Sequence, residues 1–340
     1  MKKDSKTTSI KIVSLFSGAG GLDLGFEKAG FSVIWANEFD KKIWATFQHN
    51  FPHAKLDKRS ITEISPNEIP DSDGIIGGPP CQSWSEAGSH RGIEDKRGKL
   101  FNDYIRLLKV KQPKFFLAEN VSGILAPKHS KSFNGFLKDF ETAGYVVSWD
   151  LVDANDYSVP ENRQRVIIVG YRNDLGIKFK LPENHEYKPN LRDAIGDLPE
   201  AIPAKEKNKT NGNLAIPNHE YMIGGFSTIY MSRNRVRNWS EPSFTIQAGG
   251  RHAPIHPKAP KMKKLEQDKH IFVSGNESDY RRLSVRECAR IQTFPDSFVF
   301  DYADVGDGYK MIGNAVPVNL GKAIAKQIKK DLQKWSLLQP

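Results

Sequence analysis

The sequence predicts an α/β protein with an open sheet, followed by a smaller, loop-rich region. Up to about residue 175, short apolar runs alternate with amphipathic stretches, which is the pattern of strands connected by helices. From about residue 172 to about residue 280, prolines, asparagines and lysines become frequent and the regular apolar spacing is lost. A chain of 340 residues has room for two such regions.

Six short apolar runs are the expected strands of the sheet, and they occupy residues 11–16, 31–36, 74–76, 115–118, 145–148 and 166–170. Between the first two, a glycine-rich turn precedes a helix that ends at Gly30. A capping box of Ser284 and Glu287 predicts another helix. The last helix has one apolar face, on which large side chains recur every four residues: Leu320, Ile324, Ile328 and Leu332.

Composition indicates a cytoplasmic protein without a membrane segment. Two cysteines cannot form a disulfide framework, which favours a reducing compartment. Residues 1–11 are polar and basic and lack the apolar core of a signal peptide. No stretch reaches the roughly 18 consecutive apolar residues that a membrane span requires.

The formal net charge is +10, and much of it lies between residues 231 and 264. That stretch contains eight basic residues and a single acid, Glu241. A surface that binds a polyanion requires such a concentration of charge, whereas a solvated basic loop is normally interleaved with acids. The charge pattern favours nucleic acid as a partner, with the solvated loop as the alternative.

The glycine-rich turn at residues 17–21 lies between the first strand and a helix N-terminus, a suitable site for a polar cofactor group. Twenty residues after Gly18, Glu38 ends the second strand, where a carboxylate can accept hydrogen bonds from ribose hydroxyls. Asp23 stands where a dinucleotide site has its third glycine, and an acid there would repel a pyrophosphate. S-adenosyl-L-methionine, which has a ribose but no pyrophosphate, therefore fits better, and a purely structural turn is the alternative.

Cys81 follows two prolines that end the strand at 74–76, so it lies on the loop beyond the sheet. Alone, this segment fits a nucleophile and a small buried residue equally well. Glu119 also stands at a strand end, and Arg163 and Arg165 alternate just before the strand at 166–170. Strand C-termini form the site of an open α/β sheet. We therefore expect Cys81 and Glu119 at one edge, with both arginines reaching back to it.

Six segments resemble, in their order, the motifs of the DNA cytosine-5 methyltransferases: residues 16–20, 79–82, 119–121, 163–165, 282–287 and 313–317. The resemblance covers about residues 10–328, and residues 208–260 also resemble the GGCC-specific (HaeIII-like) modification methyltransferases. It implies an S-adenosylmethionine-dependent, Rossmann-like methyltransferase. The implied organisation is a catalytic and cofactor-binding domain at 1–175, a target-recognition domain at 176–305, and a C-terminal return at 306–340.

By this resemblance, Cys81 adds to C6 of a flipped-out cytosine and so activates C5 for methylation. Glu119 would hold N3 and the exocyclic amine, and Arg165, with Arg163 beside it, would neutralise charge near O2. The implied cofactor contacts are Phe16, Gly18, Gly20, Glu38, Ser60, Ile61, Asn314 and Val316. Two positions depart from the family, which usually has an acid at Ser60 and a glutamine at Glu161. No metal is expected.

Base contacts with guanine are expected from Arg233, Arg235 and Arg251, and phosphate contacts from Arg237 and the lysines at 258–264. The alternative is that all of them contact phosphates. The resemblance implies double-stranded DNA containing GGCC as substrate. One asymmetric chain that methylates one strand at a time requires no dimer, so a monomer is expected. The sequence leaves open whether a cognate restriction endonuclease exists; if one does, it would act separately. Two other functions remain open here: an RNA cytosine-5 methyltransferase, and a catalytically silent DNA-binding regulator.

Overall fold

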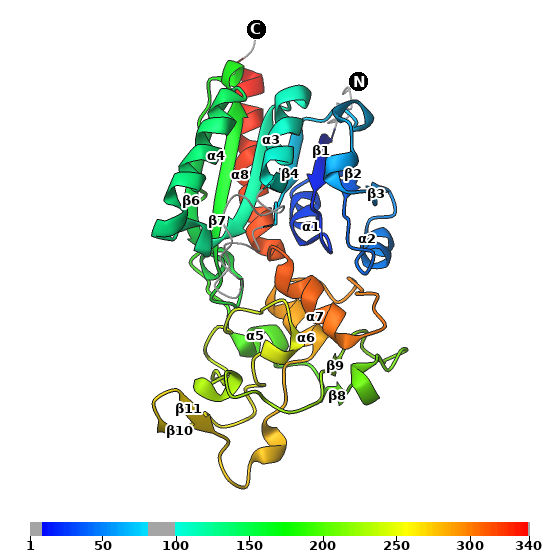
Figure 1. Ribbon diagram of the computed structural model, residues 1–340, viewed down its shortest axis with the longest axis vertical. Helices are drawn as coiled ribbons and strands as arrows, with labels where there is room; N and C mark the ends of the chain where they lie inside the picture. The colour runs from blue at the N-terminus through cyan, green and yellow to red at the C-terminus, as the bar shows by residue number, and fades with distance from the viewer. Residues whose placement is uncertain (1–8, 81–98, 339–340) are drawn as a thin grey trace, which may run out of the picture.

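The computed structural model describes residues 9–80 and 99–338. A seven-stranded sheet with helices on both faces adjoins a loop-rich region (Figure 1). The strands of the sheet are β1 (Ile10–Leu15), β2 (Phe31–Asn37), β3 (Lys55–Asp57), β4 (Gly74–Gly77), β5 (Phe115–Val121), β6 (Tyr145–Asp153) and β7 (Gln164–Arg172). The helices of this part are α1 (Gly21–Lys28), α2 (Trp44–Asn50), α3 (Lys99–Lys111), α4 (Ser130–Thr142) and α8 (Val318–Leu337).

The strand order is β3-β2-β1-β4-β5-β7-β6, so the predicted α/β fold class is confirmed. Pairing is parallel from β3 to β5, whereas β7 runs antiparallel to both β5 and β6. All six expected strands are present, and β3 is an additional strand that its polar residues concealed. The direction of β7 matters most for function, because it decides at which edge of the sheet Arg165 lies.

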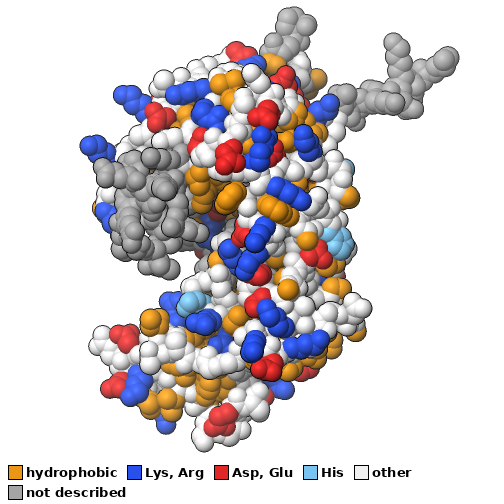
Figure 2. All heavy atoms as spheres, turned by 45° about the vertical axis from the view of Figure 1, so that its right-hand side comes forward, with side chains coloured by type: hydrophobic (Ala, Val, Ile, Leu, Met, Phe, Trp, Pro, Cys, Tyr) orange, Lys and Arg blue, Asp and Glu red, His pale blue; other side chains and the backbone are white. Residues whose placement is uncertain are grey.

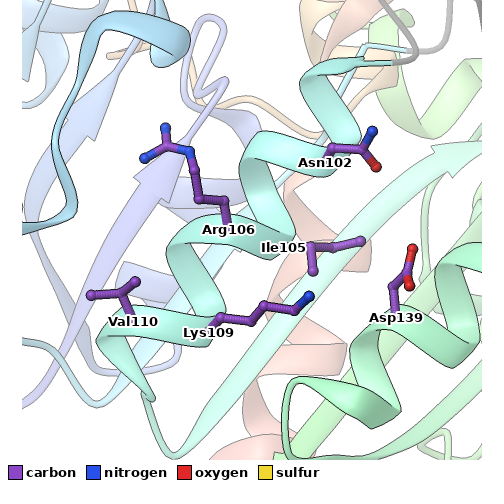
Figure 3. Close-up of a pocket in the computed structure, with 6 residues that line it drawn as sticks. All are labelled: Asn102, Ile105, Arg106, Lys109, Val110 and Asp139. Carbon is purple, nitrogen blue, oxygen red and sulfur yellow. The ribbon is translucent and has the colours of Figure 1, made fainter.

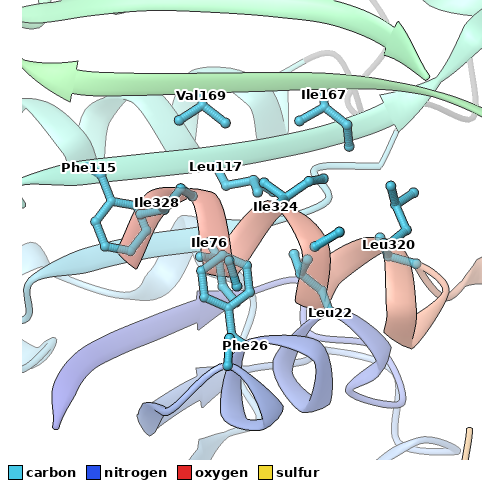
Figure 4. Packing of buried hydrophobic residues seen from close by; sticks show 14 of the residues in the cluster. Leu22, Phe26, Ile76, Phe115, Leu117, Ile167, Val169, Leu320, Ile324 and Ile328 are labelled. Carbon is cyan, nitrogen blue, oxygen red and sulfur yellow. The ribbon is translucent and has the colours of Figure 1, made fainter. Parts of the chain in front are cut away.

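Helices α1 and α8 cover one face of the sheet. Leu22 and Phe26 of α1 meet the apolar face of α8 over the strand residues, as the packing in Figure 4 shows. All four residues of the predicted α8 stripe are buried: Leu320, Ile324, Ile328 and Leu332. Helices α3 and α4 cover the opposite face, where Tyr104 and Phe140 pack against Phe116. The result is a three-layer arrangement with the sheet in the middle.

The loop-rich region contains short elements: α5 (Leu191–Ile195), β8 (Ile202–Pro203), β9 (Glu220–Tyr221), β10 (Lys263–Glu266), β11 (Lys269–Ile271), α6 (Val285–Ile291) and α7 (Val305–Asn314). It has a small core of its own around Tyr230, Val236 and Tyr280. The capping box predicted for Ser284 and Glu287 opens α6.

Helices α6 and α7 also pack into a second core, which they share with α2 of the sheet region. Cys288 and Tyr309 lie in one buried cluster with Phe47 and Phe51, which belong to α2 and the residue after it. The two regions are therefore joined by a continuous apolar contact as well as by the chain. Within the two described stretches, no helix is both long enough and apolar enough to span a lipid bilayer.

Asp23, expected from the sequence to face the cofactor, is instead completely buried in the first turn of α1. Burial raises the pKa of its carboxyl group from 3.8 to about 7, and the nearby Ser14 hydroxyl opposes this shift. Neither carboxylate oxygen has a hydrogen-bond partner among the described residues. Asp23 is thus a core residue and not a charge at the surface of the glycine-rich turn. The argument that it would repel a pyrophosphate therefore no longer applies.

The buried Asp23 carboxyl predicts a stability that falls with pH. Because its pKa is raised in the folded state, its stabilising contribution is complete below pH 3.8 and is lost as the pH rises towards 7. Relative to Asp23→Asn, the wild-type free energy of unfolding should fall by about 2 kcal/mol between pH 5.5 and 8. Urea denaturation across this range measures the difference, and parallel pH curves for the two proteins would contradict the prediction.

A second prediction concerns the contact between α1 and α8. A Cβ atom on Gly25 would lie 2.8 Å from the backbone oxygen of Val318 and 2.8 Å from the backbone nitrogen of Lys322. Gly25→Ala should therefore lower the free energy of unfolding by roughly 1–3 kcal/mol, because α8 must move. Gly135→Ala in α4 is the matched control, since a Cβ there meets nothing within 4 Å. This control should stabilise the protein by roughly 0.5–1 kcal/mol in the same urea titration.

Candidate active site

The edge of the sheet at which the parallel strands end collects the predicted catalytic and cofactor residues. The glycine-rich turn follows β1, Glu38 follows β2, and Glu119 lies near the end of β5. Arg165 pairs with Val121 because β7 is antiparallel to β5. The expectation that Arg165 must reach back along the sheet was therefore wrong: the first residues of β7 already lie at this edge.

Glu119 and Arg165 form the central ion pair of this edge. Arg165 Nε lies 2.9 Å from Glu119 Oε1, and each side chain is only 11% exposed. Burial raises the pKa of Glu119, although the charges of Arg165 and Arg163 oppose the shift. Burial also lowers the pKa of Arg165 to about 10, with a contribution from Arg163. A desolvated carboxyl group held by one guanidinium can hold a proton or bind the N–H groups of a planar ring.

The segment that leads to Cys81 passes beside this pair. Asn120 Nδ2 donates a hydrogen bond of 3.3 Å to the carbonyl oxygen of Pro79. A Cβ atom on Gly78 would lie 3.0 Å from Glu119 Oε2, so the backbone passes close to the carboxylate. Pro80 is the last described residue here, and the predicted nucleophile Cys81 lies outside the described residues.

Arg163 has different partners from Arg165. Its side chain is buried, with Nη1 donating to Ile246 O at 2.9 Å. Nη2 donates to Gly313 O at 2.8 Å and to Ala315 O at 2.9 Å. Among the described residues, Arg165 rather than Arg163 forms the ion pair with Glu119. Both arginines were predicted as catalytic, and the structure brings only Arg165 to the carboxylate.

The glycine-rich turn is held open by its backbone and by Glu38. Phe16, Gly18 and Gly20 have positive φ angles of 53°, 54° and 92°. Glu38 Oε2 accepts a hydrogen bond from Gly18 N at 2.9 Å, and Oε1 accepts one from Asp40 N at 2.7 Å. Burial raises the pKa of Glu38. A Cβ atom on Gly18 would meet nothing within 4 Å, so space for a ligand remains above the turn.

The C-terminal return reaches the same turn. A Cβ atom on Gly21 would lie 2.4 Å from Val316 O, which shows how closely the two backbones approach. Asn314, at the end of α7, is exposed, whereas Val316 is buried. The polar rim of Glu38 and Asn314 around an open glycine turn fits a ribose-bearing cofactor.

Ser60 and Ile61 lie at the start of a short 3-10 turn at Ile61–Glu63. The Ser60 hydroxyl lies 2.8 Å from Thr62 Oγ1 and caps this turn. Ile61 is buried, and its carbonyl oxygen accepts a hydrogen bond from Arg106 at 3.1 Å. Where the family usually has an acid, this chain therefore has a neutral hydroxyl that is already engaged locally.

Sequence reasoning missed two residues of this edge. Asn37 is buried, and its Nδ2 donates to Asp57 O at 3.1 Å and to Arg59 O at 2.9 Å, which fixes the segment leading to Ser60. Phe39, directly after Glu38, is 70% exposed and can stack on a planar ligand. The available signal was their position at the end of a strand, on either side of the predicted acid.

The arginines predicted to bind DNA lie in the loop-rich region, and two of the candidates for base contacts, Arg233 and Arg251, are exposed. Arg235 is buried: its Nε donates to Tyr230 O at 2.7 Å and its Nη2 to Ile229 O at 3.1 Å. These bonds fix the plane of the Arg235 guanidinium. On the face shown in Figure 2, Lys and Arg side chains are spread over the whole surface, and several lie at the narrowing between the two regions.

Arg237, predicted to contact phosphate, is half-buried and already has partners within the protein. Its Nη1 lies 3.1 Å from Glu241 Oε1, and its guanidinium covers the ring of Phe244. Lys263 and Lys264, by contrast, are exposed on β10. The phosphate-binding role assigned to this stretch is therefore best served by the lysines.

The hollow drawn in Figure 3 is not part of this edge. It has a volume of about 380 Å³ and lies against α3 and α4, between Asn102, Ile105, Lys109 and Asp139 among others. None of its residues was predicted as a site residue, and it lies on the outer surface of the helical layer. The chemistry is therefore assigned to the sheet edge and not to this hollow.

Comparisons with known proteins identify the family of this chain. The family described as C-5 cytosine-specific DNA methylase matches residues 10–330. The chain is 58% identical over 326 residues to the Type II methyltransferase M.MthTI of Methanothermobacter thermautotrophicus, covering 96% of this chain and 98% of that protein. It is 54% identical over 342 residues to the Type II methyltransferase M.NgoPII of Neisseria gonorrhoeae, covering 98% of this chain and all of that protein.

Solved structures share the fold. A putative DNA modification methyltransferase from an Escherichia coli prophage superposes with a TM-score of 0.74 at 25% identity, covering 96% of this chain and all of that one. A DNMT2 mutant of Spodoptera frugiperda superposes with a TM-score of 0.69 at 21% identity, covering 95% of this chain and all of that one. The protein is thus an S-adenosylmethionine-dependent methyltransferase, and the chain belongs to the C-5 cytosine-specific DNA methylase family.

Proposed function

We propose that this protein is the modification enzyme of a Type II restriction-modification system and methylates C5 of a cytosine within GGCC. The observation that carries the chemistry is the buried Glu119–Arg165 pair beside the segment leading to Cys81. The specificity rests on the resemblance of residues 208–260 to GGCC-specific enzymes and on the guanine-binding chemistry of exposed arginines.

Cys81 is the nucleophile in this proposal. Its thiolate adds to C6 of the cytosine, which raises electron density at C5; S-adenosylmethionine, when bound, supplies the methyl group to that carbon. Loss of the C5 proton and expulsion of the Cys81 thiolate then restore the aromatic ring. Because C6 is inaccessible in a duplex, the cytosine must first leave the base stack.

Glu119 and Arg165 hold the flipped base. The raised pKa of Glu119 suits a group that shares a proton with N3 and accepts a hydrogen bond from the exocyclic amine. Arg165 stabilises the charge that develops near O2 and favours the thiolate of Cys81. Since Arg165 is held by Glu119 at 2.9 Å, its position is set before the base arrives.

The cofactor-binding residues surround the turn after β1. Phe16, Gly18 and Gly20 shape the turn, and Glu38 accepts hydrogen bonds from the ribose hydroxyls. The remaining contacts come from the 3-10 turn and from the C-terminal return: Ser60, Ile61, Asn314 and Val316.

The target is recognised by the region at about 176–305, between the catalytic domain at 1–175 and the return at 306–340. Arg233 and Arg251, which are exposed, bind guanine edges, and the lysines at 258–264 contact phosphates. Arg235 and Arg237 instead hold this region in place through their contacts within the protein. The protein acts as a cytoplasmic monomer on one strand at a time, and a separate endonuclease cuts unmodified sites.

GGCC specificity predicts protection against a nuclease. Plasmid from cells that produce this protein should resist a nuclease that cuts GGCC, because the methyl group blocks recognition. Plasmid from cells with an empty vector is the control and should be cut completely. Complete cutting of a plasmid into which transfer of tritiated methyl groups has been confirmed would show that the target is another sequence.

Covalent catalysis predicts a trapped adduct. A duplex with 5-fluorocytosine at the target position should form a covalent complex with the wild type and S-adenosylmethionine, because fluorine at C5 cannot leave as a proton does. A denaturing gel measures this complex. Cys81→Ser should abolish it, and Cys288→Ala should retain it, since Cys288 is buried in α6. An adduct that persists in Cys81→Ser would assign the nucleophile to another residue.

A further inference from the structure

We propose that Glu161 and Arg163 are positioning residues that couple target recognition to cofactor binding, so that DNA and S-adenosylmethionine strengthen each other's binding. The inference rests on the proposed function, in which the loop-rich region binds DNA and Asn314 contacts the cofactor. It goes further by assigning a role to two buried side chains that lie where the sheet region meets the loop-rich region.

Both side chains hold the same residue of the recognition region. Glu161 Oε1 accepts a hydrogen bond from Ile246 N at 2.5 Å, and Arg163 Nη1 donates one to Ile246 O at 2.9 Å. The two charged groups lie 3.7 Å apart, and each is at most 1% exposed. Ile246 is therefore held from both sides by buried side chains.

The backbone of the turn before β7 reinforces this attachment. Asn162 N donates to Ser243 O at 3.0 Å, and Ser243 N donates to Pro160 O at 2.9 Å. Thr245 Oγ1 donates to Asn162 O at 2.6 Å. Residues 243–246 are thus attached to the turn at 160–163 by several hydrogen bonds, so the two segments are expected to move together.

Arg163 extends the same attachment to the cofactor side. Its Nη2 donates to Gly313 O at 2.8 Å and to Ala315 O at 2.9 Å, the two residues on either side of Asn314. Gly313 also touches the recognition region directly, since a Cβ there would lie 2.3 Å from the carbonyl carbon of Gln247. One guanidinium therefore bridges the recognition region and the backbone that presents Asn314.

These contacts predict energetic coupling. A shift of residues 243–248 on DNA must either move the Asn314 backbone or break hydrogen bonds of buried charged groups, which is strongly unfavourable. Arg165, the second residue of β7 and two residues after Arg163, connects this junction of residues 160–163 with 243–246 to Glu119. DNA that stabilises this arrangement also stabilises the cofactor contact, and by linkage the reverse holds equally.

The test measures binding of S-adenosylhomocysteine, the methyl-transfer product, by calorimetry, with and without a duplex that the protein methylates. The ratio of the two dissociation constants is the coupling factor. We expect about tenfold tighter binding with DNA for the wild type. Glu161→Ala should reduce this factor to less than about twofold, because Ile246 N loses its acceptor.

Two variants separate coupling from general destabilisation. Glu161→Gln retains an oxygen that accepts from Ile246 N and should keep the wild-type coupling. Glu220→Ala is the matched control. Glu220 is also buried, and it accepts a hydrogen bond of 2.7 Å from a backbone nitrogen, Asn211 N. Unlike those of Glu161, however, its hydrogen bonds to described residues do not involve residues 243–246. It should lower the thermal stability and leave the coupling factor unchanged.

If Glu161→Ala does not fold, Thr245→Val removes one neutral hydrogen bond and should lower the coupling factor roughly threefold. Normal coupling in either junction variant, or tight but independent binding of both ligands by the wild type, overturns the inference and leaves the proposed function intact. Failure of the wild type to bind or methylate any duplex refutes both.

Discussion

The antiparallel pairing of β7 with β5 is the constraint on which the site depends. It places Arg165 opposite Val121, where its guanidinium can meet Glu119 at 2.9 Å. The paired register extends from Arg165 to Tyr171, so a parallel β7 would carry Arg165 to the other edge, about 20 Å away. Neither the ion pair nor the bridge from Arg163 would then exist. Topology, more than any single contact, thus creates the catalytic edge.

Two buried ion pairs in this protein show how a carboxylate that can bind a ligand differs from one that only stabilises the fold. Glu287 accepts two hydrogen bonds of 2.8 Å from Arg281 and one from Ser284 N, and these partners lower its pKa despite burial. Among the described residues, Glu119 forms one ion pair, with Arg165, and burial raises its pKa. A fully satisfied carboxylate stabilises the fold, whereas an under-satisfied one retains capacity for a ligand. Glu119 therefore fits the ligand-binding role proposed for it at the sheet edge, whereas Glu287 does not.

The sequence allowed six strands, the α8 face and the α6 cap to be predicted, because apolar spacing and capping residues act locally. It did not reveal β3, because this strand has only three residues, with a polar residue at each end. It did not reveal the direction of β7 either, because an apolar run looks the same in a parallel and in an antiparallel strand. The burial of Arg235 was also missed, because its carbonyl partners come from the shape of a loop. Arg165 does lie at the same edge as Glu119, as predicted, but not because its side chain reaches back along the sheet. It lies there because β7 runs antiparallel to β5.

The close approaches at this edge are between backbones. Gly21 lies against Val316 O, and Gly313 lies against the carbonyl of Gln247, at separations that leave no room for a side chain. A side-chain contact can absorb a displacement by a change of rotamer, but two backbones in contact cannot. Packed interiors resist gradual deformation, so a displacement of one segment must be shared by its neighbours. The glycine turn, the C-terminal segment and the loop-rich region therefore form one mechanical unit around the site.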